Sequence, residues 1–243
     1  MRALILAAGQ GRRLGCRSRP KCLTPLVDGQ TILGYQCRAL QEYLAADQIT
    51  VTVGFGEKWV REAFPKLSYA TLPYYDEVNT AASLLVGLKE IVSRDEKDDL
   101  LLLNGDVVFA PEVIRPLIER EGNLIGVNRA QVGDEEMKYR TDSDGAIIAL
   151  SKDLKEPEGE ALGVNRLSAG ILPKLIEALE VVSPKAYFEE GLVKLIAEGV
   201  VLFPFPIGEE ECVEIDFPAD LERANRLIAG MQRADRKARS ADR

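Results

Sequence analysis

The stretch Leu4-Ile5-Leu6-Ala7-Ala8-Gly9-Gln10-Gly11-Arg12-Arg13-Leu14 decides the fold of this chain. Residues 3–8 form a continuous apolar run, which is typical of a central strand buried on both faces of a parallel sheet. Glycines directly after such a strand let the backbone approach a phosphate closely and point its N–H groups at it. The stretch therefore predicts a strand that leads into a phosphate-binding loop at one edge of a sheet.

The loop departs from two common phosphate-binding patterns. A dinucleotide-binding loop requires a glycine where Leu14 stands, and a Walker A loop requires a Gly-Lys-Ser/Thr ending. The remaining interpretation is a cradle for a nucleoside triphosphate, with positive charge supplied by the residues that follow. Five cations stand close together here, namely Arg12, Arg13, Arg17, Arg19 and Lys21. In a chain with a formal net charge of -8, this concentration favours an anion site over a solvated basic loop.

Composition excludes several classes of protein. The 243 residues are enough to bury a substantial core, and the acidic balance argues against a nucleic-acid partner. The chain has no histidine, which excludes Ser-His and Cys-His catalysis and disfavours a Cys/His zinc site. No pair of the four cysteines, at positions 16, 22, 37 and 212, has the CxxC spacing. Four cysteines in 243 residues indicate reduced thiols and not a disulfide framework.

No targeting or membrane-spanning segment is expected. Met1 leads directly into the first strand pattern without the regions of a signal peptide. No apolar stretch reaches the ~18 residues that a spanning helix needs. We therefore expect a cytoplasmic protein without a membrane partner.

Strand and helix patterns alternate along the first half of the chain. The expected strands are residues 3–8, 49–53, 69–72 and 100–103. The expected helices are residues 32–40, 57–64 and 79–92. This alternation predicts an α/β fold with a Rossmann-like, mostly parallel central sheet flanked by helices.

After about residue 120 the rhythm changes. Asp144-Gly145 between two β-rich runs indicates a hairpin, so we expect residues of about 124–166 to form an antiparallel insertion on the substrate side. Further strands are expected at 124–127, 137–141, 146–150, 200–205 and 213–215, and helices at 172–181, 188–197 and 218–228. We expect one domain over residues 1–230 and a disordered, charged tail over 231–243.

Acidic residues follow two of the expected strands. Asp106 comes after the apolar run 100–103, and Glu214 and Asp216 accompany a late strand. Carboxyl ends of parallel strands form the ligand-binding edge of a sheet, and hard carboxylates suit Mg²⁺. Asp216 has a second interpretation as the cap of the helix that begins near Pro218, and Asp106 a weaker one as a cap further downstream.

Residues 4–14, followed by Arg19-Pro20-Lys21-Cys22-Leu23, resemble the nucleotidyltransferases with a glycosyltransferase-A-like fold. The pattern of that family is LAAGxGxR(L/F/M) and then PKxL, and the resemblance extends to about residue 228. It implies a single nucleotidyltransferase domain. The residues that it implies in nucleotide binding are Ala8, Gly9, Gly11, Arg13 and Lys21.

The same resemblance implies a catalytic group and a metal. Lys21, Arg13 and Asp106 would carry the catalysis, with the two cations stabilising charge as pyrophosphate leaves. Asp106 and Asp216 would hold Mg²⁺, and Glu214 is an alternative to Asp216.

Residues 79–84 resemble the N-x(3)-S-L segment of small cytidylyltransferases that act on phosphocholine or aminoethylphosphonate. This implies CTP as the nucleotide. Asn79 and Ser83 lie four residues apart on one helical face, where both can reach a base or a ribose. Asn79 has an alternative role as the cap of that helix.

The acceptor site is expected around the hairpin. The resemblance implies that Lys138 and Lys152 meet the acceptor's phosphate, although exposed strand lysines are also common. Tyr187 is either one wall of this site or a core residue. Three arginines, at positions 129, 140 and 166, favour an acceptor with an additional anionic group.

Together these features predict a Mg²⁺-dependent cytidylyltransferase that joins CMP from CTP, or a nucleotide from another NTP, to a small phosphorylated or phosphonylated metabolite and releases pyrophosphate. A sugar-1-phosphate nucleotidyltransferase is the alternative enzyme. A non-catalytic nucleotide-binding regulatory module is the alternative of a different class. The sequence leaves the acceptor open and is compatible with a homodimer without requiring one.

Overall fold

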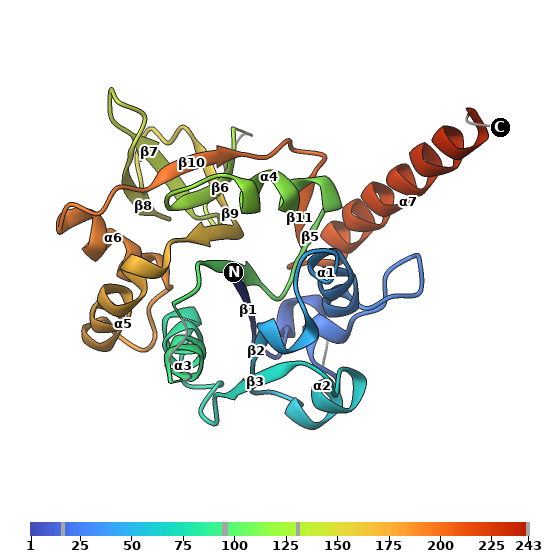
Figure 1. Ribbon diagram of the computed structural model, residues 1–243, viewed down its shortest axis with the longest axis horizontal. Coiled ribbons are helices and arrows are strands. Elements are labelled where there is room, and N and C mark those ends of the chain that lie inside the picture. The colour runs from blue at the N-terminus through green and yellow to red at the C-terminus, as the bar shows by residue number, and fades with distance from the viewer. Residues whose placement is uncertain (16–17, 94–96, 130–131, 242–243) are drawn as a thin grey trace.

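The computed structural model describes residues 1–15, 18–93, 97–129 and 132–241, with side chains described up to residue 233. A central sheet runs in the order β10-β6-β9-β4-β1-β2-β3 (Figure 1). Its strands are β1 (Arg2–Ala7), β2 (Ile49–Val53), β3 (Ser68–Thr71), β4 (Leu100–Asn104), β6 (Leu124–Asn128), β9 (Gly159–Leu167) and β10 (Phe203–Pro206).

Strand β1 lies at the middle of this sheet and is buried on both faces. It pairs in parallel with β2 and β4, so that Ile5 stands beside Val51 on one side and Leu103 on the other. Helices cover both faces, which confirms the predicted α/β fold with a mostly parallel central sheet. The helices are α1 (Ile32–Leu40), α2 (Glu57–Ala63), α3 (Thr80–Val92), α4 (Ile114–Glu119), α5 (Leu172–Val181), α6 (Glu189–Ala197) and α7 (Pro218–Ala241).

Alternating residues of β1 belong to two separate hydrophobic clusters. Ala3 and Ile5 pack with the side of the sheet covered by α1, α2 and α4. Leu4 and Leu6 pack with the side covered by α3, α5 and α6. Because successive side chains of a strand point to opposite faces, one apolar run supplies both cores.

Strand β9 was not predicted from the sequence. It lies between β4 and β6 and is antiparallel to both, so the sheet is mixed on that side. Its sequence, GEALGVNRL, contains two glycines and three polar residues, which obscure the period of a strand. The local sequence therefore gives little indication of a strand, and pairing with the apolar strands β4 and β6 determines its structure.

The expected hairpin is present as β7 (Lys138–Thr141) and β8 (Ile147–Ser151), and β7 also pairs with β9. A second antiparallel pair, β5 (Val107–Phe109) and β11 (Cys212–Glu214), was predicted only in its later strand. This short ribbon brings the segment after β4 beside the late acidic segment.

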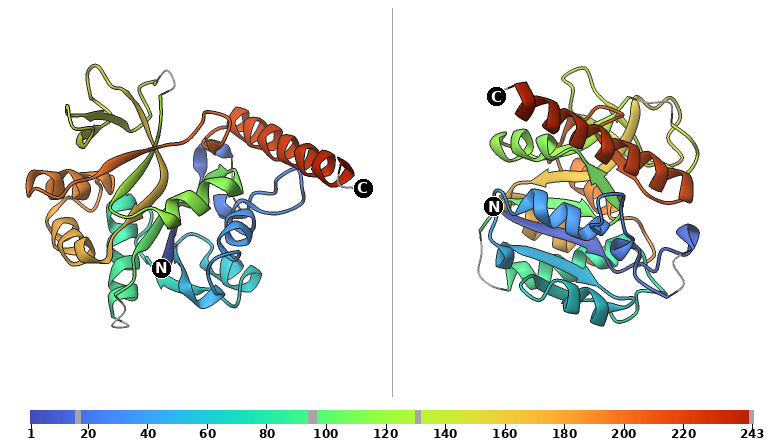
Figure 2. Two further views of the ribbon diagram at one scale, coloured as in Figure 1. Left: turned by 45° about the horizontal axis from the view of Figure 1, so that its top comes forward. Right: turned by 90° about the vertical axis from the view of Figure 1, so that its right-hand side faces the viewer.

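Helix α7 extends further than expected. Its first half packs on a third cluster, in which Ala224 and Ile228 are buried with Tyr35 and Ile215. The helix then continues to Ala241 and projects from the body of the molecule (Figure 2), through the segment expected to be disordered. Alanine, arginine, lysine and glutamine favour a helix, so a polar composition does not prevent one locally.

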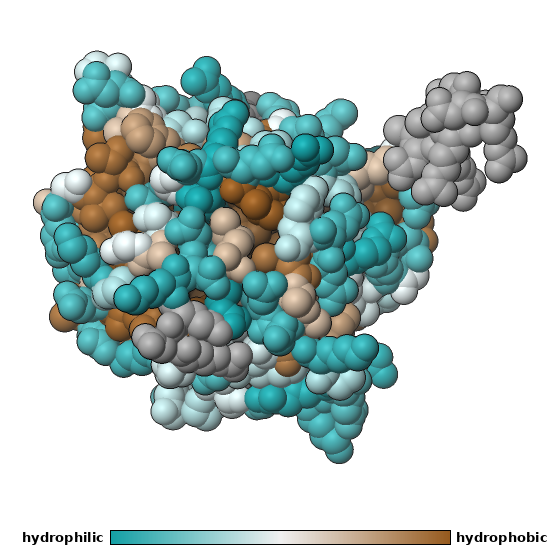
Figure 3. All heavy atoms as spheres, viewed as in Figure 1, coloured by the Kyte–Doolittle hydropathy of each residue, from teal (hydrophilic) through white to brown (hydrophobic). Residues whose placement is uncertain are grey.

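Hydrophilic residues cover much of the face shown in Figure 3, and apolar atoms gather over β8 and α6, where Ile148 and Val193 are exposed. Within the described residues, no helix has the length and apolar character needed to cross a membrane. Among the described residues, Cys22, Cys37 and Cys212 are buried and form no disulfide, as expected. Cys16 lies outside the described residues.

Candidate active site

A cavity of about 520 Å³ opens at the carboxyl ends of β1 and β4. Its wall comes from the loop after β1, the start of α3, the β4–β5 turn, the start of α6 and the segment after β11. The cavity wall includes eleven of the residues predicted to form the site, namely Ala8, Gly9, Gly11, Arg13, Lys21, Asn79, Ser83, Asp106, Lys152, Tyr187 and Asp216. Lys138 does not line this cavity among the described residues.

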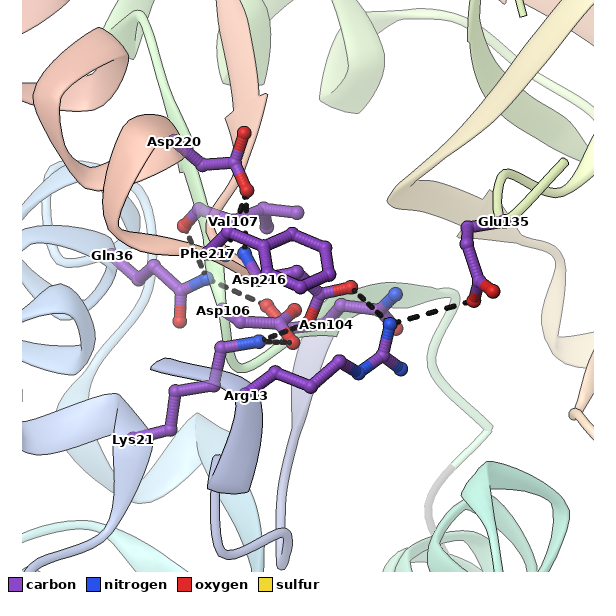
Figure 4. Close-up of polar contacts among 10 residues, drawn as sticks. All are labelled: Arg13, Lys21, Gln36, Asn104, Asp106, Val107, Glu135, Asp216, Phe217 and Asp220. Carbon is purple, nitrogen blue, oxygen red and sulfur yellow. Dashed lines mark hydrogen bonds and ion pairs between the residues drawn. The ribbon is translucent and has the colours of Figure 1, made fainter. Parts of the chain in front are cut away.

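Lys21 links the two predicted metal ligands (Figure 4). Its Nζ donates to Asp106 Oδ2 at 2.8 Å and to Asp216 Oδ1 at 2.7 Å. Burial disfavours the charged lysine, but the charge and hydrogen bond of Asp106, joined by those of Asp216, outweigh burial and raise the pKa of Lys21. The ammonium is therefore held between two carboxylates.

Gly11 allows the lysine to lie beneath the loop. Its φ of 73° is in the left-handed region, and an added Cβ would lie 2.5 Å from the Cβ of Lys21. Any other residue would therefore be strained and would also displace Lys21. This contact gives a packing reason for the glycine and the lysine to occur together in the loop sequence.

Arg13 reaches the same group from the other end of the loop. Its Nη1 lies 3.4 Å from Asp216 Oδ2 and 3.5 Å from Glu135 Oε2. Its guanidinium also lies over the ring of Phe217, 5.7 Å from the centroid. Burial opposes ionisation of Asp216, but Lys21 and then Arg13 outweigh it, so the pKa of Asp216 is below its ordinary value.

Asp106 stands in the turn between β4 and β5, where Gln36 of α1 fixes the backbone. The fully buried Gln36 donates through Nε2 to the carbonyls of Asn104 at 2.7 Å and Val107 at 2.8 Å (Figure 4). From the sequence, Gln36 was expected only as part of a helix, and this role was not predicted. An amide among apolar neighbours was the available signal. Asp106 does not cap the following 3-10 helix, since Ala110 precedes it.

The start of α7 leaves Asp216 directed at the cations. Asp220 Oδ2 accepts hydrogen bonds from the backbone N–H groups of Asp216 at 3.1 Å and Phe217 at 2.8 Å. Asp220 therefore fixes the backbone just before α7, and the hydrogen bond described for the Asp216 carboxylate goes to Lys21. Glu214 also lines the cavity, and desolvation by the surrounding protein atoms, followed by the charges of Asp106 and Asp216, raises its pKa.

The chemistry of Asp106 and Asp216 fits a hard divalent cation. Their carboxylates already converge on one cationic atom, and Asp106 Oδ1 is buried without a hydrogen-bond partner. No group of three or more His, Cys, Asp or Glu side chains within the described ranges is arranged to hold a metal. A site with two protein carboxylates matches Mg²⁺, which usually takes its remaining ligands from substrate phosphates and water.

Asn79 and Ser83 line the cavity at the start of α3. Asn79 caps this helix, because its Oδ1 accepts from the N–H of Thr80 at 2.8 Å. Capping uses Oδ1 and leaves the amide nitrogen for another partner. Ser83 is buried, and the helical turn that joins the two residues places both on the same wall.

Lys152 and Tyr187 form another part of the wall. Lys152 Nζ lies 4.4 Å from the centroid of the Tyr187 ring and 3.9 Å from Glu135 Oε2. Lys138 is turned away from the cavity wall, and its Nζ donates to the backbone carbonyl of Lys152 at 2.6 Å. In the hairpin Lys138 pairs with Ser151 and thereby supports the segment that carries Lys152.

The three arginines expected near the acceptor are elsewhere. Arg129, Arg140 and Arg166 are absent from the cavity wall in the described part of the chain. Arg166 is buried and pairs with Asp99 at 2.6 Å, at the end of β4 opposite to Asp106. These arginines therefore give no support to an additional anionic group on the acceptor, which stays a prediction. A buried arginine paired with an aspartate stabilises the fold and does not report on a ligand.

Glu189, the first residue of α6, was not predicted as a site residue. Its side chain lines the cavity, is only 9% exposed, and has an Oε2 atom without a hydrogen-bond partner. Burial raises its pKa to about 7. A glutamate in the first turn of a helix is so common that the sequence carried no distinguishing signal.

Residues 3–175 match the model of the MobA-like NTP transferase domain. The chain therefore belongs to this family of nucleotidyltransferase domains. The resemblance inferred from the loop after β1 is confirmed.

Individual relatives agree with this assignment. The bifunctional protein GlmU of Methanococcus maripaludis is 29% identical over 204 residues, covering 80% of this chain and 45% of that protein. The CMP-5'-(3-aminopropyl)phosphonate synthase of Streptomyces rubellomurinus is 33% identical over 164 residues, covering 64% of this chain and 25% of that protein. The matched region thus spans half or less of each of these two relatives.

A solved structure shows the same fold. The inositol-1-phosphate CTP transferase of T. maritima superposes with a TM-score of 0.75 at 21% identity, covering 93% of this chain and 95% of that one. The similarity in fold thus extends over nearly the full length of both chains.

Proposed function

We propose that this protein is a Mg²⁺-dependent cytidylyltransferase, which joins CMP from CTP to the phosphate or phosphonate group of a small metabolite. The observation that carries the proposal is the convergence of Lys21 on Asp106 and Asp216 directly beside the glycine loop. The name of the Streptomyces relative, a CMP-phosphonate synthase, supports cytidine as the base and a phosphonate as the acceptor group.

The reaction is an in-line substitution at phosphorus. An acceptor oxygen attacks the α-phosphorus of CTP and forms a new P–O bond. The bond between the α-phosphorus and the oxygen that bridges to the β-phosphate breaks, and its electron pair leaves with pyrophosphate. The attacking oxygen is already anionic, so no general base is needed and the lack of histidine is no obstacle.

The chain supplies binding and charge. Backbone groups at Ala8, Gly9 and Gly11 bind the nucleotide, and Arg13 and Lys21 bind the triphosphate and stabilise the departing pyrophosphate. Asn79 and Ser83 position the base or ribose. Lys152 binds the acceptor's phosphate or phosphonate, and Lys138 positions Lys152 through its backbone carbonyl.

Asp106 and Asp216 are the residues that would hold Mg²⁺, with Glu214 as the alternative to Asp216. When bound, the ion supplies charge neutralisation at the α-phosphate. The cation now shared by these carboxylates is Lys21 Nζ, so binding of a triphosphate would offer the lysine an alternative anion.

The test is pyrophosphate release with Mg²⁺, in which CTP, UTP, ATP and GTP are crossed with phosphonates, phosphocholine, inositol phosphate and sugar-1-phosphates. We expect release with CTP and a small phosphonate or alkyl phosphate. Release only with a sugar-1-phosphate would instead identify the alternative enzyme. Tight nucleotide binding without release from any pair would support the regulatory module.

A further inference from the structure

We propose that Gln36 of α1 is a positioning residue, which sets how tightly the site holds Mg²⁺ and how fast it transfers a nucleotide. Gln36 does not line the cavity in the described part of the chain, so it acts through the turn that carries Asp106. The inference rests on the proposed function, because it concerns the carboxylates of the same site. It follows from a fully buried amide whose Nε2 donates twice to this turn.

The orientation of the amide follows from its partners. Nε2 lies 2.7 Å from the carbonyl oxygen of Asn104 and 2.8 Å from that of Val107, on either side of Asp106 (Figure 4). A carbonyl oxygen only accepts hydrogen bonds, so the amide nitrogen with its two protons faces the turn. Both ends of the segment that holds Asp106 are therefore tied to the same atom of α1.

Burial separates the positional role of this amide from a role in stability. Gln36 is 0% exposed, and its neighbours in α1, Tyr35 and Cys37, belong to hydrophobic clusters. Its Oε1 atom is buried without a hydrogen-bond partner among the described residues. An unsatisfied buried oxygen offsets much of the stability that two neutral hydrogen bonds contribute. The amide therefore contributes mainly to the position of the turn.

Helix α1 also holds the segment that carries Lys21. At the start of the helix, Ile32 N donates to Thr24 O at 3.1 Å, three residues after the lysine. One helix thus contacts the backbone on both sides of the ion pair between Lys21 and Asp106. Gln36 supplies the contact on the side of Asp106.

A displacement of the turn would move both carboxylates that are proposed to hold the metal. Gly105 N donates to Leu6 O at 2.9 Å, which joins the turn to β1. Asp106 O accepts from Ile215 N at 3.0 Å, directly before Asp216. The two carboxylates therefore share a backbone connection. Small displacements of metal ligands weaken metal binding and slow the reaction, so the support of this turn affects both.

Gln36→Met tests the inference, because methionine has a similar length but no N–H donor. Calorimetry measures binding of α,β-methylene-CTP, which cannot release pyrophosphate, over a Mg²⁺ titration. We expect the Mg²⁺ concentration for half-maximal binding to rise about tenfold in the variant, since contacts that orient metal ligands have effects of this size. Binding without Mg²⁺ should be unchanged, because the glycine loop and the start of α3 are intact.

The rate of pyrophosphate release is the second readout, at a temperature where the variant is folded. At saturating Mg²⁺, kcat of Gln36→Met should fall about tenfold to a hundredfold, whereas KM for CTP should change by less than about twofold. Partial unfolding would remove active molecules without raising the Mg²⁺ requirement of the rest. Gln36→Asn keeps the amide on a shorter side chain, so its effects should be smaller and in the same direction.

Leu44→Ala is the control for lost stability. Leu44 is buried in the same hydrophobic cluster as Cys37, and its side chain has no donor for the turn. Urea denaturation should show a loss of stability in both Leu44→Ala and Gln36→Met. Leu44→Ala should nevertheless keep the Mg²⁺ dependence and the kcat of the wild type.

Wild-type Mg²⁺ dependence in folded Gln36→Met would overturn the inference, as would an equal change in Leu44→Ala. If Gln36→Met does not fold, Gln36→Asn takes its place, and unchanged Mg²⁺ dependence in that variant overturns the inference. Pyrophosphate release with unchanged Mg²⁺ dependence rejects this inference alone. A raised Mg²⁺ requirement for binding of the CTP analogue, without release from any substrate pair, rejects the proposed transfer alone.

Discussion

Lys21 takes part in a compact arrangement of charges with Asp106 and Asp216. Its ammonium lies within 2.8 Å of two carboxylates that are both well placed to hold a metal. Neutralising one side of a buried ion pair leaves the opposite charge uncompensated. The lysine therefore compensates the charge of both carboxylates and lies where a metal cation would otherwise be favoured.

Lys21→Met tests this role at the residue scale. Removing the ammonium leaves Asp106 and Asp216 facing each other, and we expect the free energy of unfolding to fall by roughly 1–3 kcal/mol, less than for a fully buried pair because both carboxylates are partly exposed. Added Mg²⁺ should then raise the Tm of the variant more than that of the wild type. The measurement is thermal unfolding over a Mg²⁺ titration.

The control is Lys58→Met, which removes an exposed lysine from α2. Its response to Mg²⁺ should equal that of the wild type. Equal Mg²⁺ responses of Lys21→Met and the wild type would contradict convergence of the two carboxylates on one cation site.

At the scale of secondary-structure elements, the apolar strands and the amphipathic helices were predictable because their periodicity is local. Strand β1 and helix α3 were predicted close to their observed bounds. Strand β9 was not, because its burial depends on pairing with β4 and β6 and its own sequence is interrupted by glycine and polar residues. Tertiary pairing determined its structure in place of local propensity.

Helix α3 packs so closely on the sheet that one position requires glycine. An added Cβ at Gly87 would lie 2.6 Å from Leu4 Cδ1 and 2.7 Å from Thr52 Oγ1, both in the core. We expect Gly87→Ala to lower the free energy of unfolding by roughly 1 kcal/mol, since overpacking outweighs the helix preference of alanine. Denaturation in urea measures the change.

Gly230→Ala is the matched control because Gly230 is also helical, in α7, and has open space around its Cβ position. Because an added Cβ at Gly230 meets no other atom, only the greater helix propensity of alanine changes the stability. The free energy of unfolding should therefore rise by up to about 1 kcal/mol. A stabilised Gly87→Ala variant would show that the contact between α3 and β1 is looser than the structure indicates.

At the scale of the whole molecule, the site joins segments that are far apart in the chain. Lys21 contacts partners 85 and 195 positions away. The resemblance to a family identified these residues one by one, but their direct contact depends on the fold and could not be deduced from spacing. Glu189 and Gln36 were missed for the same reason, since their roles depend on burial and on partners from other elements.

The C-terminal half of α7 lies away from the segments that form the candidate active site. Its described core contacts come from residues up to Met231, and the helix beyond projects from the body of the molecule (Figure 2). We expect a chain that ends at Arg233 to retain its transfer activity and to change its free energy of unfolding by less than about 0.5 kcal/mol. Urea denaturation and the pyrophosphate assay check both.

A chain that ends before Leu221 is the contrasting variant, because it loses the buried Ala224 and Ile228. It should be strongly destabilised. Loss of activity in the chain that ends at Arg233 would instead show that the projecting turns of α7 have a functional role.

The most direct test of the central claim is pyrophosphate release from CTP and 2-aminoethylphosphonate, compared between the wild-type protein and Asp106→Asn in the presence of Mg²⁺. We predict release by the wild type and at least a roughly hundredfold slower rate for the variant, since the substitution removes a carboxylate proposed to hold the Mg²⁺ that would neutralise charge at the α-phosphate. Thermal unfolding should show that the variant is folded. Equal rates of release by the two proteins would contradict the account.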